Sequence, residues 1–330
     1  MMKNGYNVTV VVLTYNPVWK KLQATLKSIV EQQDVHVQIV ITDDGSKNNY
    51  FDEVELFFKE IRFRDFKLVS NEENEGTVKN FYRGIVASDA EYIKCISPGD
   101  LLYDRLTLAK WLSFTIEKKA DITFCDAVFY NIKNGSLNII KNAHNPNNMS
   151  IYTKPSSYHD KVINYIIFED TISGATILAR KKVLLHYIAF LVQRVIYVED
   201  YFIRLAVLDK KNIVYYPQNG IWYEFDDGGI TTSGDVDWYE RTRKDFIEMD
   251  KICNEKWDKH DETVQKWLLE YYTFNKRGNI SWWSKFKRYV RHPKWFYFWV
   301  YRSFCKTYSP VEVDRTFICS CFGKDCKVAD

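Results

Sequence analysis

Carboxylates follow two apolar, strand-like segments in the first third of the sequence. Asp43 and Asp44 come one residue after the run 37–41, and Asp100 comes shortly after the run 92–96. In an open α/β sheet, ligands bind outside the carboxyl ends of the strands, where these side chains would gather. Carboxylates at that edge can hold a ribose, a base or a divalent cation.

A further acidic pair, Glu199 and Asp200, lies much later in the chain. A site for a nucleotide and a metal, combined with a separate acid, is typical of group-transfer enzymes. Each feature also has a purely structural interpretation. The segments 43–46 and 98–100 have good turn composition, and Asp200 is a charge that the dipole favours at a helix amino end.

Length and composition set the broad class of the protein. A chain of 330 residues with 46% hydrophobic residues predicts one large domain with an appendage, or two domains, around a substantial core. The net charge of +3 provides no strong field for nucleic acid, so we do not read the 16% aromatic content as a base-stacking surface. We expect no nucleic-acid partner.

The cysteines and the apolar runs bear on the cellular compartment. No apolar signal precedes the first strand, so we expect a cytoplasmic protein whose seven cysteines are reduced. Four cysteines cluster near the end, at positions 305, 319, 321 and 326, but their spacing does not match a zinc site. The apolar run 295–301 is far too short to span a membrane.

Strand and helix signals alternate over the first 130 residues. Apolar and β-branched runs predict strands at 8–13, 35–42, 66–69, 92–96 and 121–125, with helices between them. This alternation predicts right-handed βαβ units and a mostly parallel sheet. Residues 131–160 read as a loop with a hairpin turn at Asn134–Gly135, and 175–179 as another strand. From Trp238 onward the pattern is helical, which places a boundary near 235 between a domain 1–235 and an extension 236–330.

Several segments, in order and spacing, resemble the family 2 glycosyltransferases, which are inverting enzymes. The segments are VVVLTYN at 10–16, DDGS at 43–46, NEGTVKN at 74–80 and SPGD at 97–100, followed by EDY at 199–201 and Tyr223 with GGIT at 228–231. The resemblance covers residues 7–235. It implies the GT-A nucleotide-diphospho-sugar transferase fold, an α/β class with a Rossmann-like, mostly parallel sheet, here with a helical C-terminal extension.

The resemblance also implies roles for individual residues on the donor side. Tyr15 and Asp44 would contact the nucleobase, with Thr14 and Asn16 beside them and Asp43 in support. Lys79 would lie near the donor, and Gly99 near its ribose or sugar. Asp100 would bind a divalent cation, Mn²⁺ or Mg²⁺.

On the acceptor side, the resemblance makes Asp200 the general base, with Glu199, Ser173 and Gly174 around the acceptor. One departure is plain. Where the family commonly has D-x-D-D, this chain has Ser97 and Gly99 in place of two of the acids. We therefore expect weaker metal binding or an altered donor preference.

The function implied is inverting transfer of a sugar from a nucleotide sugar to a hydroxyl of a growing bacterial cell-surface glycan, such as a capsule. A UDP-sugar is favoured, with dTDP-rhamnose as the closest rival, and the acceptor is a glycan or a lipid-linked glycan. The missing acids motivate an alternative, a non-catalytic GT-A-like subunit that binds a partner transferase or a glycan. A nucleotide-dependent oxidoreductase is disfavoured because no G-x-G-x-x-G follows the first strand.

Aromatic and basic residues alternate densely between 282 and 302. Such a segment suits the headgroup level of an anionic bilayer, and would place the protein peripherally at the inner face of the cell membrane. Packing on the catalytic domain or a contact between subunits explains the same pattern, so an oligomer stays open.

Overall fold

The computed structural model describes residues 7–140, 146–225, 236–256, 261–275, 281–304, 313–323 and 326–328. The GGIT segment at 228–231 and Cys305 lie outside these residues.

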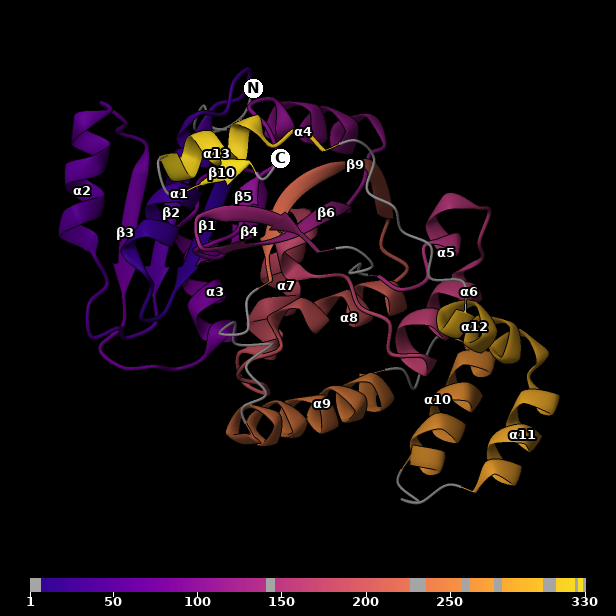
Figure 1. Cartoon of the computed structure of the whole chain (residues 1–330). Coiled ribbons are helices and arrows are strands. Elements are labelled where there is room, and N and C mark those ends of the chain that lie inside the picture. The colour runs from indigo at the N-terminus through magenta and orange to yellow at the C-terminus, as the bar shows by residue number, and fades with distance from the viewer. Residues whose placement is uncertain are drawn as a thin grey trace.

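The first half of the sheet is parallel, as the sequence predicts (Figure 1). Its strands are β1 (Val8–Thr14), β2 (Val37–Asp43), β3 (Phe66–Ser70) and β4 (Tyr92–Ile96), in the spatial order β3-β2-β1-β4. The intervening helices are α1 (Trp19–Val30), α2 (Phe51–Glu60) and α3 (Thr77–Ala87). Because side chains alternate along a strand, Val11 packs in one cluster with α3, and Val10 in another with α1 and α2.

The second half of the sheet is mixed. β8 (Ile177–Arg180) runs antiparallel between β4 and the long β6 (Ile122–Lys133). β9 (Ile213–Glu224) lies parallel to β6 and antiparallel to β5 (Leu101–Leu102). β6 continues into β7 (Ser136–Ile139) through the predicted hairpin turn, with Lys133 opposite Ser136. The strand expected at 175–179 begins at Ile177, after the 3₁₀ turn η2 (Gly174–Thr176).

Helices cover the mixed half: α4 (Thr107–Glu117), α5 (Ser150–Thr153), α6 (Tyr158–Val162), the π-turn η1 (Ile163–Ile167), α7 (Lys181–Leu191), the 3₁₀ turn η3 (Glu199–Tyr201) and α8 (Phe202–Leu208). Apart from the hairpin, the expectation that 131–160 is a loop was wrong in part, because α5 and the start of α6 lie there. The signal that was missed is a capping box, in which Ser157 and Asp160 bond each other's backbone at the start of α6.

The C-terminal region is helical, as predicted, with α9 (Val236–Lys256), α10 (Glu262–Asn275), α11 (Trp282–Arg291), α12 (Pro293–Phe304) and α13 (Thr316–Phe322). α9 begins at Val236, and the domain boundary near 235 stays a prediction. Buried residues of α9, α10 and α12 nevertheless share one hydrophobic cluster with α7 and α8. None of the described helices combines the length and apolarity needed to cross a bilayer.

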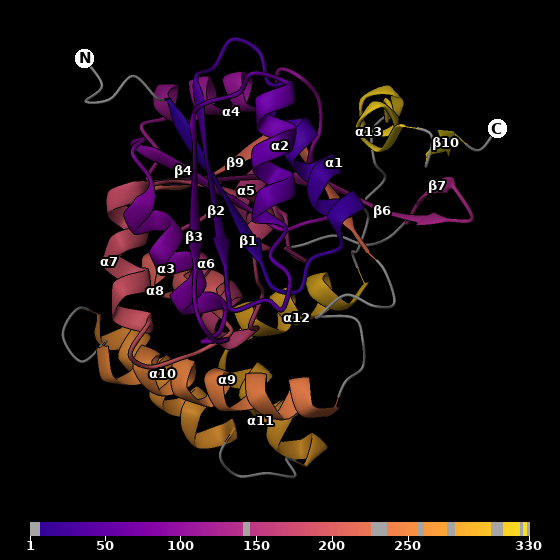
Figure 2. The same ribbon diagram turned by 90° about the vertical axis from the view of Figure 1, so that its left-hand side faces the viewer.

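The last elements return to the sheet. α13 packs against α1, and β10 (Lys327–Val328) pairs with β7 at the sheet edge, as Figure 2 shows. Phe317 and Ile318 of α13 enter a third cluster with Tyr130 of β6 and Trp222 of β9.

Candidate active site

The end of β1 and the end of β2 are joined through Asp43. Its Oδ1 accepts hydrogen bonds from Thr14 Oγ1 at 2.8 Å and Ser46 Oγ at 2.6 Å, and its Oδ2 accepts one from the Ser46 N–H at 2.8 Å. Gly45 allows the sharp turn with φ +75°, because an added Cβ would lie 2.4 Å from the Glu73 carbonyl carbon. Asp43 therefore fixes the turn after β2.

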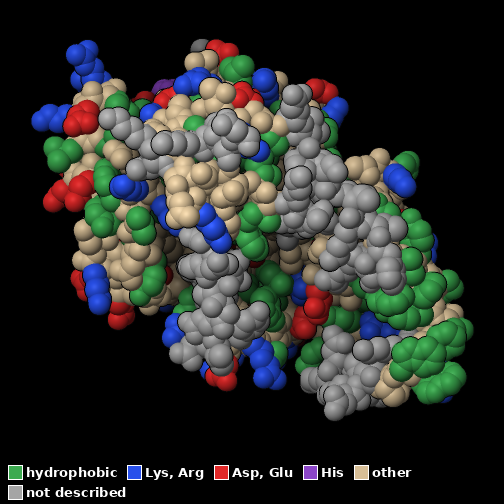
Figure 3. Space-filling model, in the orientation of Figure 1, with side chains coloured by type: hydrophobic (Ala, Val, Ile, Leu, Met, Phe, Trp, Pro, Cys, Tyr) green, Lys and Arg blue, Asp and Glu red, His purple; other side chains and the backbone are tan. Residues whose placement is uncertain are grey.

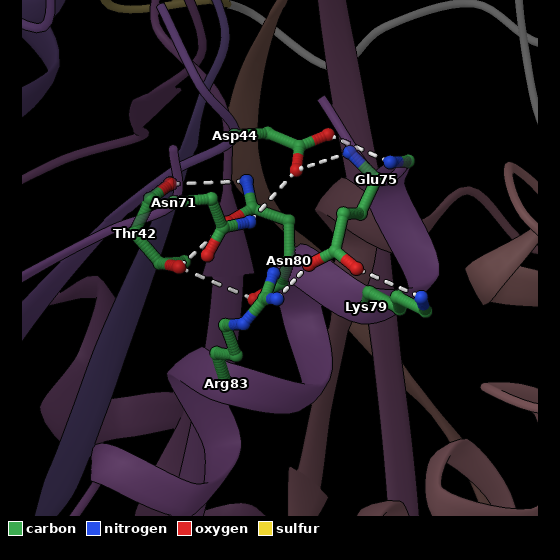
Figure 4. A network of polar contacts seen from close by, with 8 residues as sticks. Thr42, Asp44, Asn71, Glu75, Lys79, Asn80 and Arg83 are labelled. Carbon is green, nitrogen blue, oxygen red and sulfur yellow. Dashed lines mark hydrogen bonds and ion pairs between the residues drawn. The ribbon is translucent and has the colours of Figure 1, made fainter. Parts of the chain in front are cut away.

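Asp44 organises the loop that leads into α3 (Figure 4). Its Oδ1 accepts from Asn71 Nδ2 at 2.9 Å and from the Glu75 N–H at 3.0 Å, and its Oδ2 accepts from the Gly76 N–H at 2.8 Å. Burial raises the pKa of the Asp44 carboxyl, while these donors and the charge of Arg83 oppose the rise. The loop 71–76 is thus tied to the carboxyl end of β2.

Charged side chains of α3 surround this loop. Lys79 Nζ bonds Glu75 Oε1 at 2.8 Å, and Arg83 bonds the other oxygen of Glu75. Lys79, predicted near the donor, is thus held at the rim of this edge by Glu75. Asn80 anchors the helix by bonding Thr42 Oγ1 at 2.6 Å.

Tyr15 and Asn16 lie beside the same edge. The Tyr15 side chain is exposed at the end of β1, where a flat ligand could stack on its ring. Asn16 bridges to the next turn, since its N–H donates to Ser46 Oγ at 2.6 Å and its Oδ1 accepts from the Lys47 N–H at 3.1 Å. The structure therefore brings Thr14, Tyr15, Asn16, Asp43 and Asp44 to one edge of the sheet.

Asp100 lies in a buried turn after β4. The Gly99 N–H donates to Thr25 Oγ1 at 3.0 Å, and that hydroxyl donates to the Asp100 carbonyl at 2.8 Å. The Asp100 Oδ1 accepts from the N–H of Glu224, the last residue of β9, at 3.0 Å. Burial raises the pKa of Asp100 to about 7, and the Glu224 carboxylate adds to the rise.

The Asp100 turn fits a hard divalent cation. Mg²⁺ and Mn²⁺ take oxygen ligands, and often one or two protein carboxylates with phosphates and water complete the shell. Asp100 is 7% exposed, so its carboxylate has little contact with water. A cation bound there would compensate for that lost hydration. Among the described residues, no group of three or more His, Cys, Asp or Glu side chains forms a complete metal cage. The cation would therefore depend on the donor's phosphates for ligands.

Glu199 and Asp200 form the short turn η3 at the start of α8. Thr77 Oγ1 donates to Glu199 Oε2 at 2.6 Å, and the Gly174 N–H donates to the Asp200 carboxyl. Loss of hydration and the neighbouring Glu199 charge raise the pKa of Asp200 to about 7, against the opposing charge of Arg204. A carboxyl with this pKa exchanges a proton readily at neutral pH.

The carboxylates of Asp100, Glu199 and Asp200 lie around Cys95 of β4. Burial raises the pKa of the Cys95 thiol on β4, and the carboxylates of Glu199, Asp100 and Asp200 all add to the rise. The first turn of α3 is also fastened to the loop before η3, because the Val78 N–H donates to the Ile196 carbonyl at 3.0 Å. Asp100 and Glu199–Asp200, far apart in sequence, are therefore brought together.

Buried Lys94 connects β4 to the turn that contains Ser173 and Gly174. Its Nζ donates to the carbonyl of Ala175, which follows the predicted acceptor-side residues Ser173 and Gly174. Burial lowers the pKa of Lys94 to about 8. The acceptor-side turn is thus bonded to β4 by Lys94 and to η3 by Asp200.

Sequence reasoning missed five residues of this region: Lys21, Asn71, Glu75, Lys94 and Glu224. Lys94 carried a visible signal, because a lysine in the middle of an apolar strand must find partners inside the protein. The other four depend on contacts between distant segments. Lys21 and Glu224, for example, form an ion pair at 2.8 Å across 203 positions.

Comparisons with known proteins agree with this architecture. Residues 9–184, more than half of the chain, match the family described as Glycosyl transferase family 2. A curated relative, "Uncharacterized protein MJ0544" of Methanocaldococcus jannaschii, is 32% identical over 117 residues, which cover 34% of this chain and 48% of the relative. The match thus spans about half the length of that relative.

Solved structures of TarS from S. aureus share the fold. The crystal structure of TarS 1–349 gives a TM-score of 0.56 at 16% identity, covering 81% of this chain and 71% of that one. A crystal structure of TarS gives 0.54 at 16% identity, covering 81% and 43%. TarS 1–349 in complex with UDP-GlcNAc gives 0.53 at 19% identity, covering 76% and 71%. The chain has the GT-A fold and belongs to glycosyl transferase family 2.

Proposed function

We propose that this protein is an inverting glycosyltransferase that moves a sugar from a UDP-sugar to a hydroxyl of a cell-surface glycan. The observation that carries the proposal is Asp200. Its carboxyl has a pKa of about 7, accepts from the Gly174 N–H, and lies with Asp100 around Cys95. A proton acceptor is therefore next to a candidate diphosphate site, at a ligand-binding edge of the sheet. The complex of TarS with UDP-GlcNAc supports a UDP-sugar donor.

The donor's base would occupy the edge formed by the ends of β1 and β2. The exposed Tyr15 ring offers a stacking face, with Asp44 and Thr14 beside it. Asp43 and Asn16 act by holding the turn, since their side chains bond its backbone. Lys79 lies on the first turns of α3, where its ammonium group can leave Glu75 and pair with a phosphate of the donor.

A divalent cation, when bound at Asp100, would neutralise charge that develops on the departing diphosphate. Gly99 precedes Asp100 in this turn, where the resemblance places it near the donor's ribose or sugar. Asp200 takes the proton from the acceptor hydroxyl as that oxygen forms its bond to the anomeric carbon. The bond from that carbon to the diphosphate breaks on the opposite face, so the configuration inverts. Glu199, Ser173 and Gly174 line the acceptor side.

Nucleotide release tests the proposal. With Mn²⁺ and a panel of UDP-sugars and dTDP-rhamnose, we expect release of free nucleotide for at least one donor when an acceptor glycan is present. Thermal-shift measurements on the same panel report donor binding separately, since a ligand of the native state raises the melting temperature. Donor binding without turnover, in both the wild type and Asp200→Asn, would favour the non-catalytic subunit instead.

A lipid-linked acceptor would bring the protein to a membrane, and one surface suits that contact. Exposed aromatic rings gather on α11 and α12: Trp282, Trp283, Phe286, Phe296 and Trp299. They form the green area over these helices at the lower right of Figure 3. The same two helices carry the exposed cations Lys287, Arg291 and Lys294, of which Arg291 pairs with Glu270 and Lys294 with Asp160. We therefore propose peripheral contact between this α11–α12 surface and an anionic bilayer.

Point substitutions test this surface better than truncation. Removing 280–330 would also take Trp295 and Phe298 out of the main cluster. The triple variant Trp282→Ser, Trp283→Ser, Phe286→Ser should lose sedimentation with vesicles containing phosphatidylglycerol. A control with exposed apolar residues changed elsewhere, Leu56→Ser and Ile116→Ser, should keep it. Equal sedimentation of the triple variant and the wild type would contradict membrane contact at this surface.

A further inference from the structure

The turn that carries Asp100 has no room for a side chain at Gly99. Gly99 has φ +104°, a conformation that L-residues rarely adopt. A Cβ added there would lie 2.2 Å from Glu224 Oε2 and 3.0 Å from Glu224 Cδ. The carboxylate of Glu224 thus fills the space in which a side chain at position 99 would begin.

Glu224 is held rigidly beside Asp100. Its N–H donates to Asp100 Oδ1 at 3.0 Å. β9 is paired with β5 directly after the turn, with Trp222 opposite Leu101. From the other side, the hydroxyl of Tyr130 donates to the Gly99 carbonyl. The backbone of Glu224 is therefore placed beside the turn by strand pairing, and its side chain reaches over Gly99 from there.

The charge of Glu224 is balanced by Lys21 of α1. Lys21 Nζ lies 2.8 Å from Glu224 Oε2, and the Glu224 side chain is 17% exposed. The Glu224 carboxylate raises the pKa of Asp100, so a positive charge near the two is favourable. Lys21 provides such a charge for Glu224 from outside the turn.

We propose that Glu224 supplies the second carboxylate of the cation site, replacing the acid that is absent at position 99. Lys21 is its counter-charge when no cation is bound. The inference rests on the proposed function, because transfer from a nucleotide diphosphate calls for the cation. An acid at position 99 would be strained at φ +104° and would begin where the Glu224 carboxylate now lies.

Binding of Mn²⁺ tests the proposal without any sugar transfer. The free aqueous Mn²⁺ signal in electron paramagnetic resonance is titrated with protein, alone and with UDP, at fixed pH and salt. We expect Glu224→Gln to weaken Mn²⁺ binding at least tenfold and Asp100→Asn to abolish it. We expect Lys21→Met to tighten binding of Mn²⁺ alone severalfold, because the competing ammonium is gone.

A matched control separates a ligand from a distant charge. Glu31→Gln removes one negative charge from another ion pair, that between Glu31, directly after α1, and Arg105 at 2.6 Å, and should leave Mn²⁺ binding unchanged. Circular dichroism melts establish that each variant is folded. Should Glu224→Asp, which keeps the charge, bind better than Glu224→Gln, a direct role of the carboxylate is supported.

The proposal is overturned if Glu224→Gln, folded, binds Mn²⁺ as the wild type does, or if Glu31→Gln weakens binding equally. It is also overturned if the wild type with UDP does not bind Mn²⁺. If Mn²⁺ binds through Glu224 but no donor is turned over, the proposed function fails and the cation site stands. The two outcomes are thus distinguishable.

Discussion

Two pairs of adjacent acids lie near the ligand-binding edge of this protein, and their surroundings differ. Asp43 and Asp44 accept six hydrogen bonds between them, from side chains and backbone of the turns around β2. Glu199 and Asp200 also accept hydrogen bonds, from Thr77, from Gly174 and from the backbone of their own turn, but burial and the Glu199 charge raise the pKa of Asp200 to about 7. The first pair is therefore built into the turns, while the second pair carries the carboxyl that we propose as the proton acceptor.

The difference shows what to measure at each pair. A carboxylate whose lone pairs are taken by buried donors contributes mainly to the free energy of unfolding. A carboxylate poised near neutral pH contributes mainly to the reaction rate. Substitutions should therefore separate the two pairs, with opposite patterns in stability and in turnover.

The largest effect is expected for Asp200→Asn. The asparagine side chain can still accept the hydrogen bond from the Gly174 N–H, but it cannot take the proton of the glycan hydroxyl. We therefore expect kcat to fall by about 10²- to 10⁴-fold. UDP binding should stay at the wild-type level. Steady-state nucleotide release measures kcat, and calorimetry measures UDP binding. A variant that retains full turnover would remove Asp200 as the base.

Asp44→Ala should act on stability. It leaves Asn71 and the N–H groups of Glu75 and Gly76 without their acceptor, so we expect a loss of about 2–4 kcal/mol in the free energy of unfolding. Denaturant titration measures this loss. A matched substitution, Asp52→Ala on the exposed face of α2, should cost far less. Equal losses would show that Asp44 does not organise the loop.

The wild-type pH profile sharpens the comparison further. Because the base must be ionised and the pKa of Asp200 is about 7, kcat should fall about tenfold per pH unit below that value and level off above it. The contribution of Asp200 to the free energy of unfolding changes with pH in the opposite direction. A carboxyl whose pKa is raised by folding stabilises the protein below its unfolded pKa, and this contribution is lost as pH rises through 7. Asp200→Asn should therefore melt at a higher temperature than the wild type at pH 8 and not at pH 4.

The smallest effect concerns the bond between Thr77 and Glu199. This bond lowers the pKa of Glu199, so Thr77→Val should make Glu199 hold a proton more tightly. With Glu199 more often neutral, Asp200 loses a repelling charge, and the acidic limb of the kcat profile should move to lower pH by less than about one unit. Thr77→Ser should leave the limb in place. A shift to higher pH would contradict the coupling.

The sequence predicted the parallel half of the fold well. Apolar runs such as 8–13 and 92–96 are sufficient to identify buried strands, and strand ends identify where ligands gather. The prediction that Asp43, Asp44 and Asp100 share one sheet edge follows from that rule alone. Local patterns were less informative where Asn and Ser dominate, as in 131–160, and there the short helices were missed.

What could not be predicted depends on pairings between distant segments. Glu224 meets Gly99 only because β9 pairs with β5 across more than a hundred residues. Asn71 reaches Asp44 through the position of β3 beside β2. Neither contact leaves a trace in residue type or spacing, because each residue alone is an ordinary polar residue in a turn or at a strand end.

The return of α13 to the sheet has a practical consequence for how the protein is handled. Phe317 and Ile318 pack on Tyr130, whose hydroxyl secures the Gly99 carbonyl. Trimming the polypeptide before residue 313, or fusing a bulky reporter beside β10, would loosen the support behind the Asp100 turn. An expression design that aims at crystals or at screening should keep these residues intact and carry its affinity handle at the opposite terminus.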